Sequence, residues 1–131
     1  MFDRPAGIPD DLVISFAPLC LATVHQKVDN PANGAIALMS GMVRQETQGR
    51  GVKCLEYQAY NPMAIAVFQS IAQQIRQRWP TVTGVVIHHR TGKLAIGEIS
   101  VLVAIGCPHR AEAFAACLLY TSDAADDLTR V

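Results

Sequence analysis

No stretch of this 131-residue chain reaches the roughly 18 consecutive apolar residues of a membrane-spanning helix. The N-terminus, Met1 to Pro5, lacks the basic segment and the following apolar segment of a secretory signal, so we expect a cytoplasmic protein. An excess of charge is also lacking, because eleven Lys and Arg balance eleven Asp and Glu. This balance excludes the broad basic surface of a nucleic-acid-binding protein, and any recognition of an anion must therefore be local.

Closely spaced cysteines are absent too. Cys20, Cys54, Cys107 and Cys117 are widely scattered and form no Cys-x-x-Cys pair. We expect reduced, mostly buried thiols, and a disulfide or a metal set is the alternative. The adjacent His88 and His89 point to opposite faces of a strand, so they cannot both bind one ion. No metal site is expected, with or without His25.

Half of the residues are hydrophobic, which suits one domain that buries roughly two-thirds of its unfolded surface. The clearest helix begins at Asn61, a good N-cap, followed by Pro62 at the first helical position. We predict strands over 11–17, 35–44, 52–60, 82–89, 93–96 and 99–106, and helices over 18–28, 61–79 and 111–120. This order predicts an α+β domain, a mixed sheet with helices packed on it.

Two further expectations concern the middle of the chain. The polar segment Gln45 to Gly51, which contains Gly49 and Gly51, is predicted to be a mobile loop. Tyr57, Tyr60 and Met63 are expected to pack the long helix against the sheet, and stacking on a substrate is the alternative.

Two strand ends carry cations. Cys107-Pro108-His109-Arg110 joins an apolar strand to an alanine-rich helix, where the free N–H groups of the helix start favour an anion. Arg44 ends another apolar run, Ala35 to Val43. We interpret the two ends as one anion-binding pocket. The alternative is that Arg44 and Arg110 are ordinary solvated residues.

Several short strings also occur in a characteristic order: Gly34-Ala35, Gly41-Met42-Val43-Arg44, Leu55 to Ala64, Arg78-Trp79-Pro80, His89 to Gly92, Gly97-Glu98 and His109-Arg110-Ala111. Each string is weak alone, but the ordered combination is specific. It resembles the large, catalytic subunit of molybdopterin synthase, the MoaE family. The resemblance runs from about Asp11 to Cys117, so we predict one family domain over 1–117.

The resemblance implies an α/β-hammerhead fold and a homodimer. A small ubiquitin-like sulfur-carrier subunit would dock at each end of the dimer and complete a heterotetramer. The thiocarboxylate of the carrier would donate sulfur to cyclic pyranopterin monophosphate, giving molybdopterin for molybdenum cofactor biosynthesis. No cofactor of the large subunit itself is implied.

The resemblance also implies the site residues. Met42, Val43 and Arg44 would form one wall of the substrate site, and His109 and Arg110 another. The arginines suit phosphate or thiocarboxylate, because a guanidinium stays charged and can bind oxygens with two parallel bonds. His109 and Arg110 are the catalytic candidates. His109 would donate a hydrogen bond or shuttle a proton, and a structural role is its alternative.

Residues 118–131 depart from the family. The family continues with a lysine on this helix, then proline, an aromatic residue, tryptophan and a second lysine, whereas the lysines here are Lys27, Lys53 and Lys93 alone. A helix lysine would attack or polarise the thiocarboxylate of the carrier. We therefore predict that the tail is foreign to the family, and a degenerate homologue is the alternative. The alternative function is an inactive fragment or binding module that keeps the dimer and the anion pocket.

Overall fold

The computed structural model describes residues 10–47, 50–51, 54–57 and 61–122. Three helices, α1 (Leu21–Val28), α2 (Asn61–Arg78) and α3 (Arg110–Ser122), alternate with the strands as predicted. The strands are β1 (Asp11–Ser15), β2 (Ala35–Met42), β3 (Glu46–Thr47), β4 (Arg50–Gly51), β5 (Cys54–Tyr57), β6 (Gly84–Arg90), β7 (Gly92–Ala95) and β8 (Ile99–Cys107). The α+β class is confirmed.

The main sheet has four strands in the order β1-β6-β8-β2. β1 runs parallel to β6, whereas β6 and β2 both run antiparallel to β8, so the sheet is mixed as expected. Two small ladders, β3 with β4 and β5 with β7, complete the strand pairing. β2 forms one edge of the main sheet, and its last pairs with β8 contain a register shift between Gly41 and Met42.

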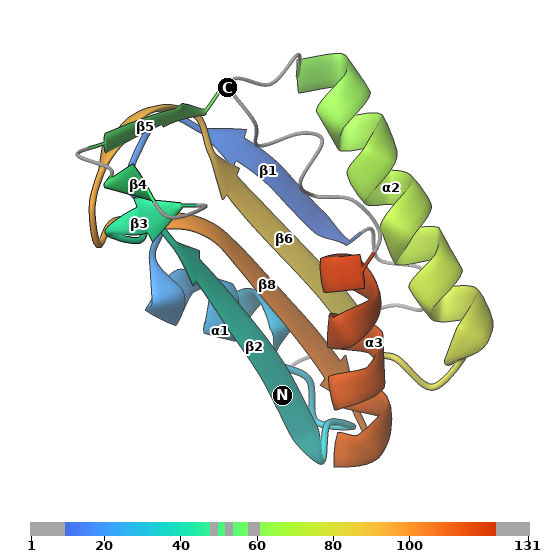
Figure 1. Ribbon diagram of the computed structural model, residues 1–131. Helices are drawn as coiled ribbons and strands as arrows, with labels where there is room; N and C mark the ends of the chain where they lie inside the picture. Colours follow the sequence, from blue (N-terminus) through green and yellow to red (C-terminus); the bar gives the residue numbers. More distant parts are fainter. Residues whose placement is uncertain (1–9, 48–49, 52–53, 58–60, 123–131) are drawn as a thin grey trace.

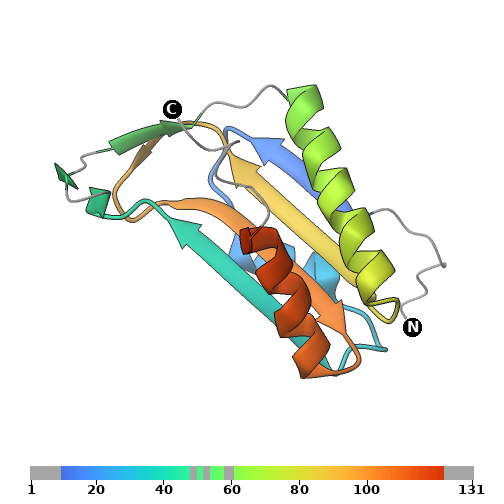
Figure 2. The same cartoon turned by 45° about the vertical axis from the view of Figure 1, so that its right-hand side comes forward.

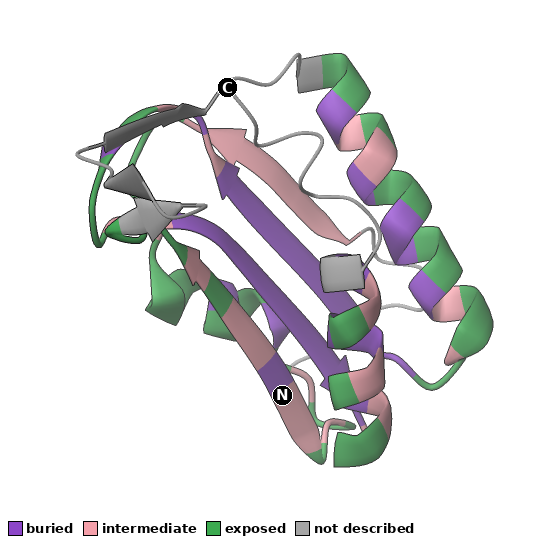
Figure 3. Ribbon diagram, viewed as in Figure 1, coloured by how far each residue is buried: buried purple, intermediate pink, exposed green. Residues whose placement is uncertain are grey.

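The helices cover both faces of the main sheet. α2 and α3 lie on one face and α1 on the other (Figures 1 and 2). Alternate residues of β8 pack against the two helix layers. Val103 and Ile105 point into the core beneath α2 and α3. Leu102 and Ala104 point to the other face, toward α1. Because alternate residues of a strand face opposite sides, a strand covered on both faces is apolar throughout. Figure 3 shows this as continuous burial along the two central strands, β6 and β8.

The apolar spacing along α2 is confirmed by its packing. Phe68, Ile71 and Ile75 are buried against the sheet, at helical spacing. Arg76 near the end of this helix binds the carboxylate of Asp10 and donates to the Val82 carbonyl oxygen at 3.2 Å. The same carboxylate accepts the Val85 N–H at 3.2 Å, so this ion pair attaches the start of β1 to β6 and α2.

Three local predictions need correction or fall outside the described residues. The first helix begins at Leu21 rather than at Pro18, with Cys20 as its extended N-cap. The 45–51 segment contains the β3–β4 ladder, so it is not wholly a loop. Met63 is 56% exposed and does not pack α2 on the sheet, because it lies on the outer side of the first turn. Tyr60 and the side chain of Tyr57 lie outside the described part of the chain.

In the described part of the chain, no helix combines the length and the apolar character that crossing a membrane requires.

Candidate functional site

The first candidate segment, Met42 to Arg44, lies where the edge strand β2 ends. Met42 is 54% exposed and Arg44 is exposed, whereas Val43 between them is buried. The Val43 N–H donates to the Glu98 carbonyl oxygen at 3.0 Å, and the Val43 carbonyl oxygen accepts the Gly97 N–H at 2.8 Å. Val43 is therefore fixed through both its N–H and its carbonyl oxygen, and it separates Met42 and Arg44, whose side chains are exposed to solvent.

A polar cluster lies beside this segment. The Glu98 carboxylate accepts the Ala95 N–H at 2.7 Å and the Arg90 Nη1–H at 2.8 Å. These two contacts lower the pKa of Glu98, the backbone hydrogen bond more than the guanidinium. Arg90 also donates from Nε to the Phe16 carbonyl oxygen at 3.2 Å. These contacts, together with the burial of His89 beside Phe68, indicate a structural role for His89 and Arg90.

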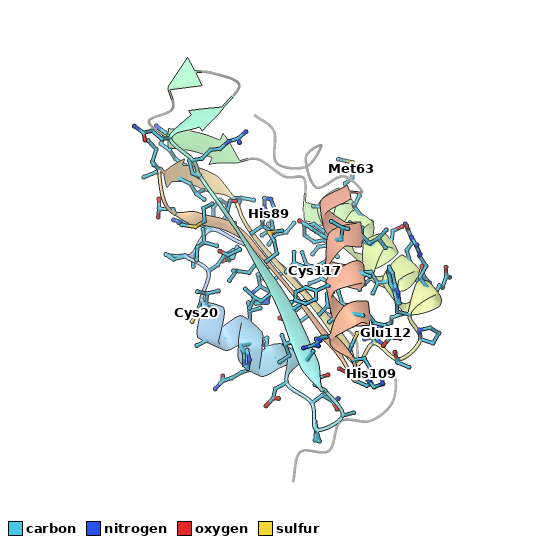
Figure 4. The ribbon with its side chains drawn as sticks, turned by 60° about the horizontal axis from the view of Figure 1, so that its bottom comes forward. Cys20, Met63, His89, His109, Glu112 and Cys117 are labelled. Carbon is cyan, nitrogen blue, oxygen red and sulfur yellow. The ribbon has the colours of Figure 1, made fainter. Side chains whose placement is uncertain are left out.

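The second candidate segment is the junction between β8 and α3. Arg110 is the first residue of α3, and the His109 carbonyl oxygen accepts the Ala113 N–H at 3.3 Å. The side chains of both His109 and Arg110 are exposed. Figure 4 shows His109 at the lower end of α3, next to Glu112. An imidazole and a guanidinium thus stand at the positive end of a helix that has thirteen residues, an arrangement that favours an anion.

The backbone beneath this junction is closely packed. The Gly34 N–H donates to the Cys107 carbonyl oxygen at 2.9 Å, and a Cβ added at Gly34 would lie 2.1 Å from the Pro108 carbonyl oxygen. A Cβ added at Gly106 would meet the Asn33 side chain at 2.7 Å. Asn33 is itself bonded to Thr83 and, through Nδ2, to the Val28 carbonyl oxygen at 3.0 Å. These contacts fix the direction in which the chain enters α3.

Glu112 is a charged group at this junction that the sequence analysis did not single out. Its Oε1 is buried and has no hydrogen-bond partner among the described residues. The pKa of the Cys107 thiol is raised mainly by burial and, to a smaller extent, by the negative charge of Glu112. Its position three residues after His109, in the first turn of the helix, is the signal that could have pointed to it.

The described thiols differ in exposure. Cys107 and Cys117 are buried, and burial raises the pKa of both, which disfavours the nucleophilic thiolate. Cys20 is exposed at the start of α1, where hydrogen bonds with Thr23 lower its pKa. All three are free thiols. The described residues contain no group of three or more His, Cys, Asp or Glu side chains that could hold a metal ion.

The two adjacent histidines do face opposite sides, as predicted. His89 is buried beside Phe68 of α2, and His88 contacts the Asp11 carboxylate at 2.5 Å on the other face. Lys27 of α1 lies 3.8 Å from the same carboxylate. The Asp11 carboxylate of β1 thus links β6, through His88, with α1, through Lys27.

One copy of the chain does not bring Arg44 and Arg110 together. Ala35 pairs with Cys107 at one end of the β2–β8 ladder, and Met42 pairs with Ile99 at the other. Seven steps of about 3.3 Å along a strand separate these ends by roughly 23 Å. One copy alone therefore does not form the predicted pocket, because neighbouring antiparallel strands end at opposite ends of the sheet. A pocket shared between two copies stays a prediction.

Comparison with known proteins gives a consistent result. The sequence model of the family described as "MoaE protein" matches residues 14–121. A relative from Nostoc sp., named molybdopterin synthase catalytic subunit, is 62% identical over 110 residues, which cover 84% of this chain and 67% of the relative.

Solved structures share the fold. The crystal structure of molybdopterin synthase from Staphylococcus aureus superposes with a TM-score of 0.78 at 34% identity, covering 83% of this chain and 79% of that one. A complex of subunits 1 and 2 of the molybdopterin-converting factor from Helicobacter pylori matches with a TM-score of 0.71 at 20% identity, covering 86% and 75%. At that identity the second likeness concerns the fold alone.

Proposed function

This chain belongs to the MoaE family, the molybdopterin synthase catalytic subunits of molybdenum cofactor biosynthesis, and on that premise we propose that it serves in sulfur transfer to cyclic pyranopterin monophosphate. A small ubiquitin-like carrier subunit delivers each sulfur as a C-terminal thiocarboxylate. Two sulfurs enter the substrate and form the dithiolene of molybdopterin. With free thiols, one of them exposed, the chain suits a reducing compartment, and we place the reaction in the cytoplasm.

The substrate site in this proposal is shared by two copies of the chain. Met42, Val43 and Arg44 of one copy face His109 and Arg110 of the other. The observation that carries this is the separation of roughly 23 Å between the two cation-bearing ends within one copy, worked from the strand register. A homodimer with two-fold symmetry can bring the unlike ends together twice, which gives two equivalent sites.

Each residue has a role that follows from its chemistry. The substrate phosphate and the arriving thiocarboxylate are both anions, so a site that holds them close together needs fixed positive charge. Arg44 and Arg110 supply that charge with geometry that matches oxygen pairs. His109 donates a hydrogen bond or transfers a proton, since an imidazole changes protonation near neutral pH.

A second candidate function is a binding module that holds the substrate or the carrier without turnover. The observation that favours it is Ala125, which stands at about the position where the family has its first helix lysine. Asp123, Asp126 and Asp127 add negative charge around that position. An assay with thiocarboxylated carrier and cyclic pyranopterin monophosphate separates the two functions, because only the enzyme consumes the thiocarboxylate.

The shared site is tested by substitutions in separate copies. Arg110→Ala is expected to abolish substrate binding, and Arg44→Ala to weaken it by roughly 1.5–3 kcal/mol, as for the loss of one charge-assisted hydrogen bond. Heterodimers of one Arg44→Ala chain and one Arg110→Ala chain, isolated with two affinity tags, retain one intact and one doubly altered site. By calorimetry they should therefore bind about one substrate per dimer with the dissociation constant of the unaltered protein. Binding that is as weak as that of Arg44→Ala homodimers, or absent, would contradict a shared site.

A further inference from the structure

The position of Arg44 depends on a turn in another part of the chain. β2 ends at Met42, directly after a register shift, so the strand ladder does not extend to Val43. Two hydrogen bonds hold Val43 instead, from the Gly97 N–H at 2.8 Å and to the Glu98 carbonyl oxygen at 3.0 Å. Both partners belong to the turn between β7 and β8.

The side chain of Glu98 holds this turn in shape. Its Oε1 accepts the Ala95 N–H at 2.7 Å, while the Glu98 N–H donates to the Ala95 carbonyl oxygen at 3.1 Å. The turn passes through Gly97 at a φ of +88°, a conformation that the other nineteen residue types rarely adopt. The carboxylate therefore closes a turn whose two outward hydrogen bonds support Val43.

Arg90 in turn fixes the carboxylate. Its Nη1 donates to Glu98 Oε2 at 2.8 Å, and its Nε donates to the Phe16 carbonyl oxygen at 3.2 Å. The Arg90 side chain is 14% exposed, so its charge is largely withdrawn from solvent and paired. The end of β1, the end of β6 and the β7–β8 turn are thus joined at one point.

We propose that Arg90 and Glu98 are positioning residues for the anion site at Arg44, and this rests on the proposed function of that site. They set the direction of the chain at Val43, and through it the directions of Arg44 and Met42. Arg90 also neutralises the carboxylate that lies beside a site for anions.

Whether Glu98→Gln strengthens or weakens substrate binding separates a positioning role from a simple effect of charge. Glu98→Gln keeps the size of the side chain but replaces one accepting oxygen with an NH₂ group and removes a negative charge. If Glu98 acted only as a nearby charge, its removal would tighten the binding of an anion. Positioning predicts the opposite, weaker binding by about tenfold, which is less than the loss expected when the Arg44 side chain is removed altogether.

The experiment measures the dissociation constant of cyclic pyranopterin monophosphate by titration calorimetry for the full-length chain. Four proteins form a cycle: the unaltered chain, Arg44→Ala, Glu98→Gln and the double variant. Positioning predicts that Glu98→Gln weakens binding while Arg44 is present and has a much smaller effect once Arg44 is alanine, when only Met42 can still be displaced. Asp10→Asn is the matched control, because Asp10 also accepts from an arginine and a backbone N–H, at the opposite end of the sheet.

Each outcome decides a different point. Unchanged or tighter binding by Glu98→Gln, beside a weakened Arg44→Ala, overturns the positioning role and leaves the proposed function standing. Equal weakening by Glu98→Gln in both backgrounds, or equal weakening by Asp10→Asn, overturns it as well, because general destabilisation explains those results. If Arg44→Ala itself binds normally, the proposed function of this end of the sheet is wrong.

Discussion

The close approach of Gly34 to Pro108 gives the sharpest test of how the Arg110 end of the sheet is built. A methyl group added at Gly34 would lie 2.1 Å from the Pro108 carbonyl oxygen and 3.1 Å from its carbonyl carbon. These are backbone atoms, which cannot rotate away as the end of a side chain can. Gly34→Ala must therefore move the β8–α3 junction or break the bond from the Gly34 N–H to the Cys107 carbonyl oxygen.

The cost of this substitution can be worked out roughly. Overpacking a tight site costs about 1–3 kcal/mol, and the loss of one backbone hydrogen bond adds about 1 kcal/mol. For a chain of this size each kcal/mol lowers Tm by about 3–4 °C, so a total of about 2–4 kcal/mol lowers it by about 6–16 °C. Because the junction carries His109 and Arg110, substrate binding should weaken as well.

The assay is thermal unfolding followed by circular dichroism, with Gly97→Ala as the control. A Cβ at Gly97 meets nothing within 4 Å, so its cost is only that of the left-handed backbone at φ +88°, about 1–2 kcal/mol. Gly34→Ala should therefore unfold at a lower temperature than Gly97→Ala. A Tm for Gly34→Ala within a degree of the unaltered chain would refute the packing described here.

Two further predictions concern the core. Burial lowers the pKa of His89, so the unfolded chain binds a proton at this residue more readily than the folded chain does. The free energy of unfolding, measured by urea unfolding across pH, should therefore be highest above about pH 6.5 and should fall as the pH drops below that value. His89→Phe should remove this dependence, and His25→Gln should leave it in place. Phe68→Ala should destabilise the chain by about 3–5 kcal/mol, because the ring is 1% exposed between α2 and the sheet, whereas Gln69→Ala on the exposed side should change the urea midpoint little.

Much of the fold could be predicted from the sequence because its signals are local. Asn61 followed by Pro62 marks the start of α2, and the spacing of Phe68, Ile71 and Ile75 marks its buried side. The apolar run of β8 indicates a strand covered on both faces, which it is. Errors arose where the local signal was weak. Met63 has an apolar side chain but lies on the outer side of α2, and the polar 45–51 segment pairs with itself as β3 and β4.

The candidate site divides in the same way. Charge, spacing and resemblance were enough to select Met42, Val43, Arg44, His109 and Arg110, because each selection rests on residue type and neighbouring sequence. Glu98 and Glu112 were not selected, since their significance comes from contacts with Arg90, Ala95 and Cys107.

The sequence by itself determined which segments become strands and helices, which sides of them are apolar, and which residues carry cations at strand ends. Only the tertiary structure decided where those ends lie. Hydrophobic periodicity is the same whether two strands pair parallel or antiparallel, and β2 and β8 pair antiparallel. That choice sends Arg44 and Arg110 to opposite ends of one sheet, so the single site that we propose for them requires a second copy of the chain.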